Sequence, residues 1–263
     1  MCPGDRKRFG RSRAVLWAAL MTCAACGIPS AVMASVSSPL SYAAEGDADE
    51  SAAQHVRDGL TSDMLANFGL FLYIDKSETG PFAQTMYVFQ KTDAGDIVLL
   101  HKWPVSSGRD DIEADAHGRA RSTSTPRGYF ELDPKRMFED HISAQWNEAM
   151  PYAMFFDWAP KGHPTGLAIH GAPDDRNELG SPASAGCIRL SISHAETLFS
   201  LVQSQFRGAV PRLAYLDGDT GVSSEGLFLH DKDGNLQMAD GYSVLVLIDG
   251  FTGSDQVSSL MGE

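Results

Sequence analysis

The chain has 263 residues, a hydrophobic fraction of 43% and a mean hydropathy of −0.18, values typical of a soluble globular protein. This length accommodates one medium domain plus a targeting segment, or two small domains. The formal net charge of −13 argues against nucleic-acid binding, because the chain would repel phosphates, and the same acidity agrees with ordinary solubility.

Residues 1–34 are expected to form a signal peptide. A basic segment precedes the apolar run 14–26, which is too short to span a bilayer comfortably. Pro29 breaks this run, and the following "VMA" predicts cleavage after Ala34. Lipoprotein processing at Cys26 is the alternative. We therefore expect an exported protein of the periplasm or cell envelope.

Cys187 is the one cysteine that this cleavage leaves, because the removed segment holds three of the four (4 − 3 = 1). Cleavage also changes the net charge to −13 − 4 = −17, since that segment carries five basic residues and one acidic residue. A leftover thiol in an oxidising compartment is buried and inert, bridges to another molecule, or acts as a nucleophile. Residue type alone leaves the three readings open.

The remaining chain predicts a mainly β fold. Residues 35–66 are rich in Ser, Ala and Asp and are expected to be a linker followed by a short helix, "ESAAQHVRDGLTSDMLANF" (50–68). Residues 67–217 contain short β-like runs between turn residues, without the helix–strand alternation of a doubly wound sheet. We expect a β-sandwich or barrel-like sheet with one packed α-helix after Cys187, capped by Ser193 and ended by Gly208.

The segment 218–263 is expected to be a C-terminal extension. It contains one hairpin signal, "HDKDGNLQ", and one strand-like run, "YSVLVLID". Its role does not follow from the sequence.

The surroundings of Cys187 favour the nucleophile reading. Small residues precede it, and Gly186 permits a turn whose successive N–H groups converge on one oxygen, as an oxyanion hole requires. A thiolate needs a base or a positive charge nearby. His170 at the end of an apolar run is the candidate base, and Arg189 shares a strand face with the thiol. The alternatives are a satisfied structural histidine and a structural ion pair.

These residues carry a family resemblance. The segments "AIHG" (168–171) and "SAGCIRL" (184–190) together resemble the signature of the L,D-transpeptidase catalytic domain, the YkuD-like fold. Two further segments, 124–132 and 150–156, resemble the family's Thr-Pro-x-Gly-x-Phe turn and the run before its histidine strand. The resemblance covers residues 68–216.

The resemblance implies an acyl transfer on peptidoglycan stem peptides. Cys187 attacks the carbonyl of an L-centre–D-centre bond, His170 takes the thiol proton, and the carbonyl of Gly171 holds the imidazole tautomer. The thioester then passes to an amine of a second stem peptide, giving a 3–3 cross-link, or to a D-amino acid or protein lysine. The resemblance implies no metal and no cofactor, and it implies inhibition by carbapenem-type β-lactams.

The expected oxyanion hole consists of the backbone N–H groups of Ala185, Gly186 and Cys187. Ala185 departs from the family, which usually has a histidine at this position, so one imidazole is missing from the cleft. This departure concerns rate and acceptor choice more than the nucleophile.

Further residues are expected to bind substrate: Arg189, Ser184, Tyr152, Asp174 and Asp175. The two aspartates lie in the loop between base and nucleophile, where carboxylates can bind the ammonium of a diamino acid while an arginine receives a carboxylate. The alternative is a solvated surface loop.

Three other functions remain open. Water can accept the same thioester, which gives a peptidoglycan carboxypeptidase or amide hydrolase. A catalytically silent wall-binding module would keep Cys187 buried and without a histidine nearby. A metal site built from His163, His170, Cys187 and His194 fits no usual zinc spacing.

Overall fold

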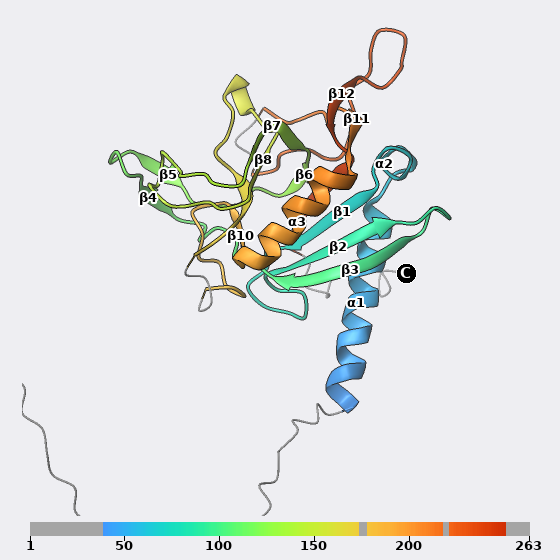
Figure 1. The fold of residues 1–263 in the computed structure, drawn as a ribbon, viewed down its shortest axis with the longest axis horizontal. Coiled ribbons are helices and arrows are strands. Elements are labelled where there is room, and N and C mark those ends of the chain that lie inside the picture. The colour runs from blue at the N-terminus through green and yellow to red at the C-terminus, as the bar shows by residue number, and fades with distance from the viewer. Residues whose placement is uncertain (1–38, 174–177, 218–220, 251–263) are drawn as a thin grey trace, which may run out of the picture. The chain divides into compact units, whose positions relative to one another are not determined.

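The computed structural model describes residues 39–173, 178–217 and 221–250 (Figure 1). The expected signal peptide with Cys26 lies outside the described residues, as do Asp174 and Asp175 of the predicted substrate loop. Within the described ranges, no helix is both long enough and apolar enough to cross a membrane.

Five strands form the larger sheet. Their bounds are β1 (Leu70–Asp75), β2 (Thr85–Lys91), β3 (Ile97–Pro104), β6 (Gly128–Phe130) and β13 (Val244–Asp249). The strand order is β3-β2-β1-β13-β6, and β13 pairs with β1 in parallel, with Leu70 opposite Val244. The expected boundary at residue 217 therefore does not follow the packing. The segment after it supplies an interior strand of this sheet, and its predicted hairpin forms a single bridge between His230 and Leu236.

Four strands form the smaller sheet, which carries the candidate site. They are β7 (Leu132–Phe138), β8 (Ala153–Phe156), β9 (Ala168–Gly171) and β10 (Ile188–Leu190), in the order β10-β9-β8-β7. Only β9 and β10 pair in parallel in this sheet. The remaining short elements are β4 (Ile112–Ala114), β5 (Ala120–Ser122), the 3₁₀-helix η1 (Pro160–Gly162), β11 (Arg207–Pro211) and β12 (Met238–Tyr242).

The predicted helix after the cysteine is α3 (Ile192–Gln205). Its cap is Ser191, whose hydroxyl accepts the N–H of His194, so the helix begins before the predicted cap Ser193. It ends before Gly208, which lies in β11. The apolar face of α3 packs into the core between the two sheets, and this arrangement confirms the mainly β fold with a packed helix.

Most of residues 50–68, where a short helix was expected, is helical, but the helical structure already begins at Pro39, within the expected linker. Residues 39–59 form α1 (Pro39–Gly59), and α2 (Ser62–Asn67) follows. Ala52, Ala53 and Val56 of α1 are buried against the face of the larger sheet that α3 does not cover (Figure 1). Both faces of β1 and β13 are therefore buried, which explains their continuous apolar runs.

Candidate active site

Two neighbouring strands bring the predicted catalytic groups to one face. β9 ends in His170 and Gly171, and Cys187 directly precedes β10. The parallel register places Arg189 opposite His170. Because side chains alternate along a strand, Cys187 projects from the same face as Arg189, whereas Ile188 points into the core and is fully buried. A thiol, an imidazole and a guanidinium thereby meet on one side of the sheet.

The imidazole of His170 is held in one tautomer. Its Nδ1 lies 2.7 Å from the carbonyl oxygen of Gly171, the contact that the resemblance implied. A carbonyl oxygen can only accept, so Nδ1 carries the hydrogen and Nε2 keeps its lone pair. Burial lowers the pKa of His170 to about 4, and the positive charge of Arg189 contributes in the same direction. The ring is therefore neutral at pH 7 and available as a base.

The thiol of Cys187 is also neutral at rest. Burial raises its pKa to about 11, although a backbone contact with Ala168 and the charge of Arg189 act in the opposite direction. Its Sγ lies 3.5 Å from the carbonyl oxygen of Gly166. The resting pair is thus a thiol beside an imidazole, and not a thiolate–imidazolium ion pair. Such a thiol becomes nucleophilic when the base removes its proton during attack.

Two cavities adjoin His170. A small one of about 30 Å³ is lined by His170, Cys187 and Ala185, together with Trp146 from the loop above. A larger one of about 380 Å³ is lined by His170 and by the charged side chains of Arg109, Glu148, Glu178 and Arg189. His170 therefore adjoins both the cavity of the nucleophile and a larger polar cavity.

Arg189 is already paired with two carboxylates. Its guanidinium donates to Glu178 at 2.7 Å and to Glu148 at 3.1 Å, and its side chain is only 11% exposed. The expectation that Arg189 receives a substrate carboxylate is not supported by this arrangement, which is the structural ion pair named as its alternative. Sequence reasoning missed Glu148, because no local pattern connects it to a residue 41 positions away.

Ser184 supports the backbone and does not reach substrate. It is fully buried, and its hydroxyl accepts the N–H of Gly186 at 3.0 Å and donates to the carbonyl of Cys187. Because the N–H of Gly186 already has an acceptor, the expected oxyanion hole narrows to the N–H groups of Ala185 and Cys187. The side chain of Ser184, predicted to bind substrate, instead stabilises the backbone around the nucleophile.

Tyr152 faces α3 and not the cavities. Its ring packs against Phe199 with centroids 5.8 Å apart. Its pKa is raised, first of all by a hydrogen bond with Glu196 of the same helix. It lines neither of the two cavities around His170, so its role in substrate binding stays a prediction. No group of three or more His, Cys, Asp and Glu side chains able to hold a metal ion occurs among the described residues.

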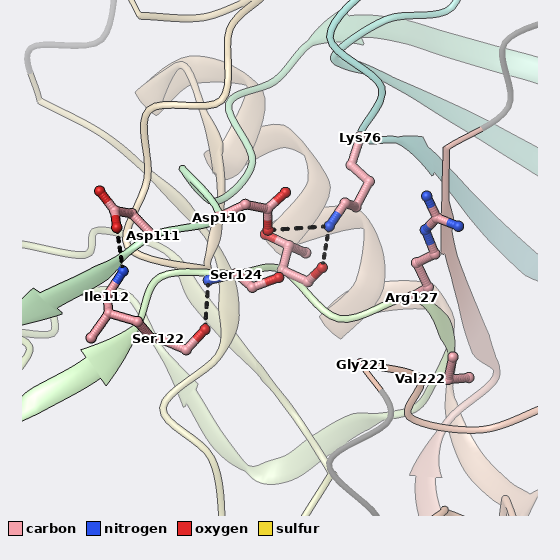
Figure 2. A pocket seen from close by; sticks show the side chains of 10 residues that line it. Lys76, Asp110, Asp111, Ile112, Ser122, Ser124, Arg127, Gly221 and Val222 are labelled. Atoms are coloured by element: carbon pink, nitrogen blue, oxygen red, sulfur yellow. Dashed lines mark hydrogen bonds and ion pairs between the residues drawn. The ribbon is translucent and has the colours of Figure 1, made fainter.

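A third cavity lies among Lys76 and the segments 110–112, 122–127 and 221–222 (Figure 2). Its volume is about 560 Å³, and its lining includes Lys76, Asp110, Ser124, Thr125 and Arg127. The ammonium of Lys76 donates to the carbonyl of Thr125 at 2.7 Å and lies 3.5 Å from Asp110. None of the predicted catalytic residues lines this cavity.

Comparison with known proteins agrees with this geometry. The family model described as the L,D-transpeptidase catalytic domain, YkuD, matches residues 72–238, more than half of the chain. No protein of curated function matches the chain.

Three similar solved structures illustrate the relationship. The L,D-transpeptidase LdtMt1 in complex with imipenem is 17% identical, with a TM-score of 0.39, and the match covers 69% of this chain and 59% of that one. An L,D-transpeptidase of Xylanimonas cellulosilytica is 18% identical, with a TM-score of 0.36, over 70% of this chain and 61% of that one. The helical cell shape determining protein Pgp2 of Campylobacter jejuni is 14% identical, with a TM-score of 0.37, over 73% and 53%. The chain thus spans less than two thirds of the length of each of these proteins. On the family match, the chain belongs to the L,D-transpeptidase catalytic domain family, YkuD.

Proposed function

We propose that the protein is an L,D-transpeptidase that acts on peptidoglycan stem peptides through a thioester on Cys187. One observation carries this proposal. His170 lines the same small cavity as Cys187, and the carbonyl of Gly171 fixes its ring so that Nε2 keeps a free lone pair. A silent wall-binding module needs neither an anchored base nor a cavity shared by thiol and imidazole.

The neutral resting pair determines the order of events in the first half-reaction. As Sγ attacks the carbonyl carbon of the L-centre–D-centre bond, Nε2 of His170 takes the thiol proton. The tetrahedral oxyanion is held by the N–H groups of Ala185 and Cys187. When the carbon–nitrogen bond breaks, the imidazolium returns this proton to the departing amine of the D-residue. A thioester on Cys187 and a neutral imidazole remain.

The second half-reaction reverses these roles. The neutral amine of an acceptor attacks the thioester, and His170 accepts the proton that the nitrogen loses. Collapse of the tetrahedral intermediate expels the thiolate, which takes the proton back from the imidazolium. The larger cavity that His170 also lines offers an approach for the acceptor. If water takes the acceptor's place, the same site acts as a hydrolase.

The decisive experiment is mass spectrometry of purified stem-peptide fragments after incubation with the protein. Loss of the terminal D-residue together with cross-linked dimers is the result expected for a transpeptidase. Loss of that residue without dimers identifies the hydrolase, and unchanged fragments exclude both enzymes. Cys187→Ser should abolish turnover, because a hydroxyl is much less acidic and less polarizable than a thiol. His170→Ala should reduce turnover about a hundredfold or more.

Carbapenem sensitivity and export complete the proposal. The family membership and the imipenem complex of a similar protein support acylation of Cys187 by a carbapenem. An increase in intact-protein mass that Cys187→Ser abolishes is the expected result. For export, N-terminal sequencing of the protein recovered from the cell envelope should begin at Ser35 after signal cleavage, or should find an acylated Cys26 if the anchor is used.

A further inference from the structure

Two buried hydroxyl groups hold the backbone on either side of the nucleophile. The Oγ1 of Thr125 donates to the carbonyl oxygen of Gly186 at 2.8 Å. The hydroxyl of Ser184 accepts the N–H of Gly186 and donates to the carbonyl of Cys187. Both side chains are at most 1% exposed. Three backbone groups next to the nucleophile are therefore fixed from inside the protein.

The bond from Thr125 also fixes a group that it does not touch. The carbonyl of Gly186 and the N–H of Cys187 belong to one planar trans peptide, in which the two point in opposite directions. Thr125 is buried, so it draws this carbonyl inward. The N–H of Cys187 consequently points away from Thr125, and Cys187 lines the small cavity together with Ala185. This N–H is the one expected to stabilise the oxyanion.

Three hydrogen bonds fix the hydroxyl and the carbonyl of Thr125. Its Oγ1 accepts the N–H of Gly108 at 2.8 Å, which leaves its hydroxyl hydrogen directed at Gly186. Its own carbonyl oxygen accepts a hydrogen bond from the ammonium of Lys76 at 2.7 Å, and both residues line the third cavity (Figure 2). The turn also requires glycine at 186, where φ is +113° and an added Cβ would lie 3.0 Å from the carbonyl oxygen of Ser124. The hydroxyl and the peptide that it holds thus have little freedom to move.

We propose that Thr125 is a positioning residue that aims the N–H of Cys187 at the oxyanion of the acyl-transfer intermediate. The proposal rests on the proposed function only in requiring acyl transfer to Cys187, and it does not depend on which peptide is the donor. Without the hydroxyl, the 186–187 peptide can rotate and the N–H loses its alignment, although the thiol stays in place. The expected defect is therefore confined to reactions that form an oxyanion.

Two chemical probes of Cys187 separate this role from a general structural one. Acylation by p-nitrophenyl acetate passes through a tetrahedral oxyanion, whereas alkylation by iodoacetamide does not. Both rates are followed on the full chain at the Cys187 peptide by mass spectrometry. Thr125→Val keeps the shape but removes the hydroxyl, and it should slow acylation about ten- to a hundredfold, within the range for loss of an oxyanion-hole donor. Alkylation should change less than about twofold.

Thr123 provides a matched control in the same segment. It is fully buried, and its Oγ1 also accepts one backbone N–H and donates to one carbonyl, but both groups belong to Asp111 and not to the nucleophile turn. Thr123→Val should leave the acylation-to-alkylation ratio unchanged. Thr125→Ser keeps the hydroxyl and should restore that ratio, and Thr125→Ala serves if the valine variant does not fold.

Three outcomes would overturn the proposal. The first is an equal loss of both rates in Thr125→Val, and the second is an unchanged acylation rate in that variant. The third is a wild-type acylation-to-alkylation ratio no higher than that of a free thiol, since no oxyanion donor would then be at work. Incubation with stem peptides is measured separately. A protein without transpeptidase activity but with the expected ratios would refute the proposed function and leave the role of Thr125 standing.

Discussion

Arg189 and His170 are register partners in the parallel pair of β9 and β10, so a guanidinium lies beside the imidazole on the same face. This position gives the arginine an electrostatic role in addition to its ion pairs. Its positive charge is the largest contribution after burial to the low pKa of His170. Glu148 and Glu178 hold the guanidinium in place.

Replacing this charge should raise the pKa of His170. Arg189→Gln removes a positive neighbour and leaves Glu148 and Glu178 without their partner, and both changes favour the imidazolium. In the pH profile of kcat/KM, the acidic limb is expected near pH 4 in the wild type, at the pKa of His170, and it should move to higher pH in this variant. Arg189→Lys keeps the charge and should shift the limb less. Identical limbs in the two variants would show that the charge has no such effect.

Acidification should destabilise the protein through His170. The unfolded histidine takes up a proton near pH 6.5, whereas the folded one does so only near its pKa of about 4. Between these values the unfolded state binds more protons, so the free energy of unfolding falls as the pH falls, by up to about 1.4 kcal/mol per pH unit. Urea titrations of wild type and His170→Gln between pH 7 and pH 4.5 measure this. The variant should lose less stability, and parallel losses would contradict the burial of a neutral ring.

The rate of Cys187 alkylation should be low at neutral pH and should rise steeply with increasing pH. With a thiol pKa of about 11, the thiolate fraction increases about tenfold per pH unit up to pH 10. Iodoacetamide labelling at Cys187 should follow this slope without levelling off, whereas a free cysteine levels off above about pH 8.5. A plateau near pH 7 would instead reveal a thiolate–imidazolium pair and would contradict the neutral resting state.

The helix α1 should contribute to stability. Val56 is 2% exposed in the cluster that joins α1 to the larger sheet. Val56→Ala should lower the free energy of unfolding by about 2 kcal/mol, because it leaves a cavity. The neighbouring Arg57 pairs with Glu50 at an exposed position, so Arg57→Ala should cost less than about 0.5 kcal/mol. Equal effects in thermal or urea unfolding would mean that α1 is not docked as described.

The sequence predicted the parts of the site that lie in short local motifs. His170, the Gly171 carbonyl and Cys187 follow from two segments whose spacing the family shares. The mainly β core was likewise predictable from short apolar runs between turn residues. The length of α1 was underestimated, because a short helix was expected over residues 50–68 whereas α1 begins at Pro39, in a segment rich in Ser, Ala and Asp whose buried residues are few and small.

Contacts between distant residues could not be predicted in this way. The pairing of Arg189 with Glu148 depends on how a loop folds over the sheet. Tyr152 directly precedes β8, which pairs with the histidine strand β9, yet its φ of +55° accompanies a turn and its ring packs against α3. The hydroxyl of Thr125 meets Gly186 across 61 positions. Each of these contacts is a product of the three-dimensional fold, for which one sequence holds no local signal.

The interior position of β13 has a consequence for folding kinetics. β1 is formed near one end of the described chain, but its parallel neighbour comes from residues 244–249 at the other end. Until those residues are available, β1 keeps one unpaired edge, and such edges invite association with other chains. Pairing across so long a separation is intrinsically slow. The larger sheet therefore cannot be completed until residues 244–249 have been synthesised and have inserted between β1 and β6.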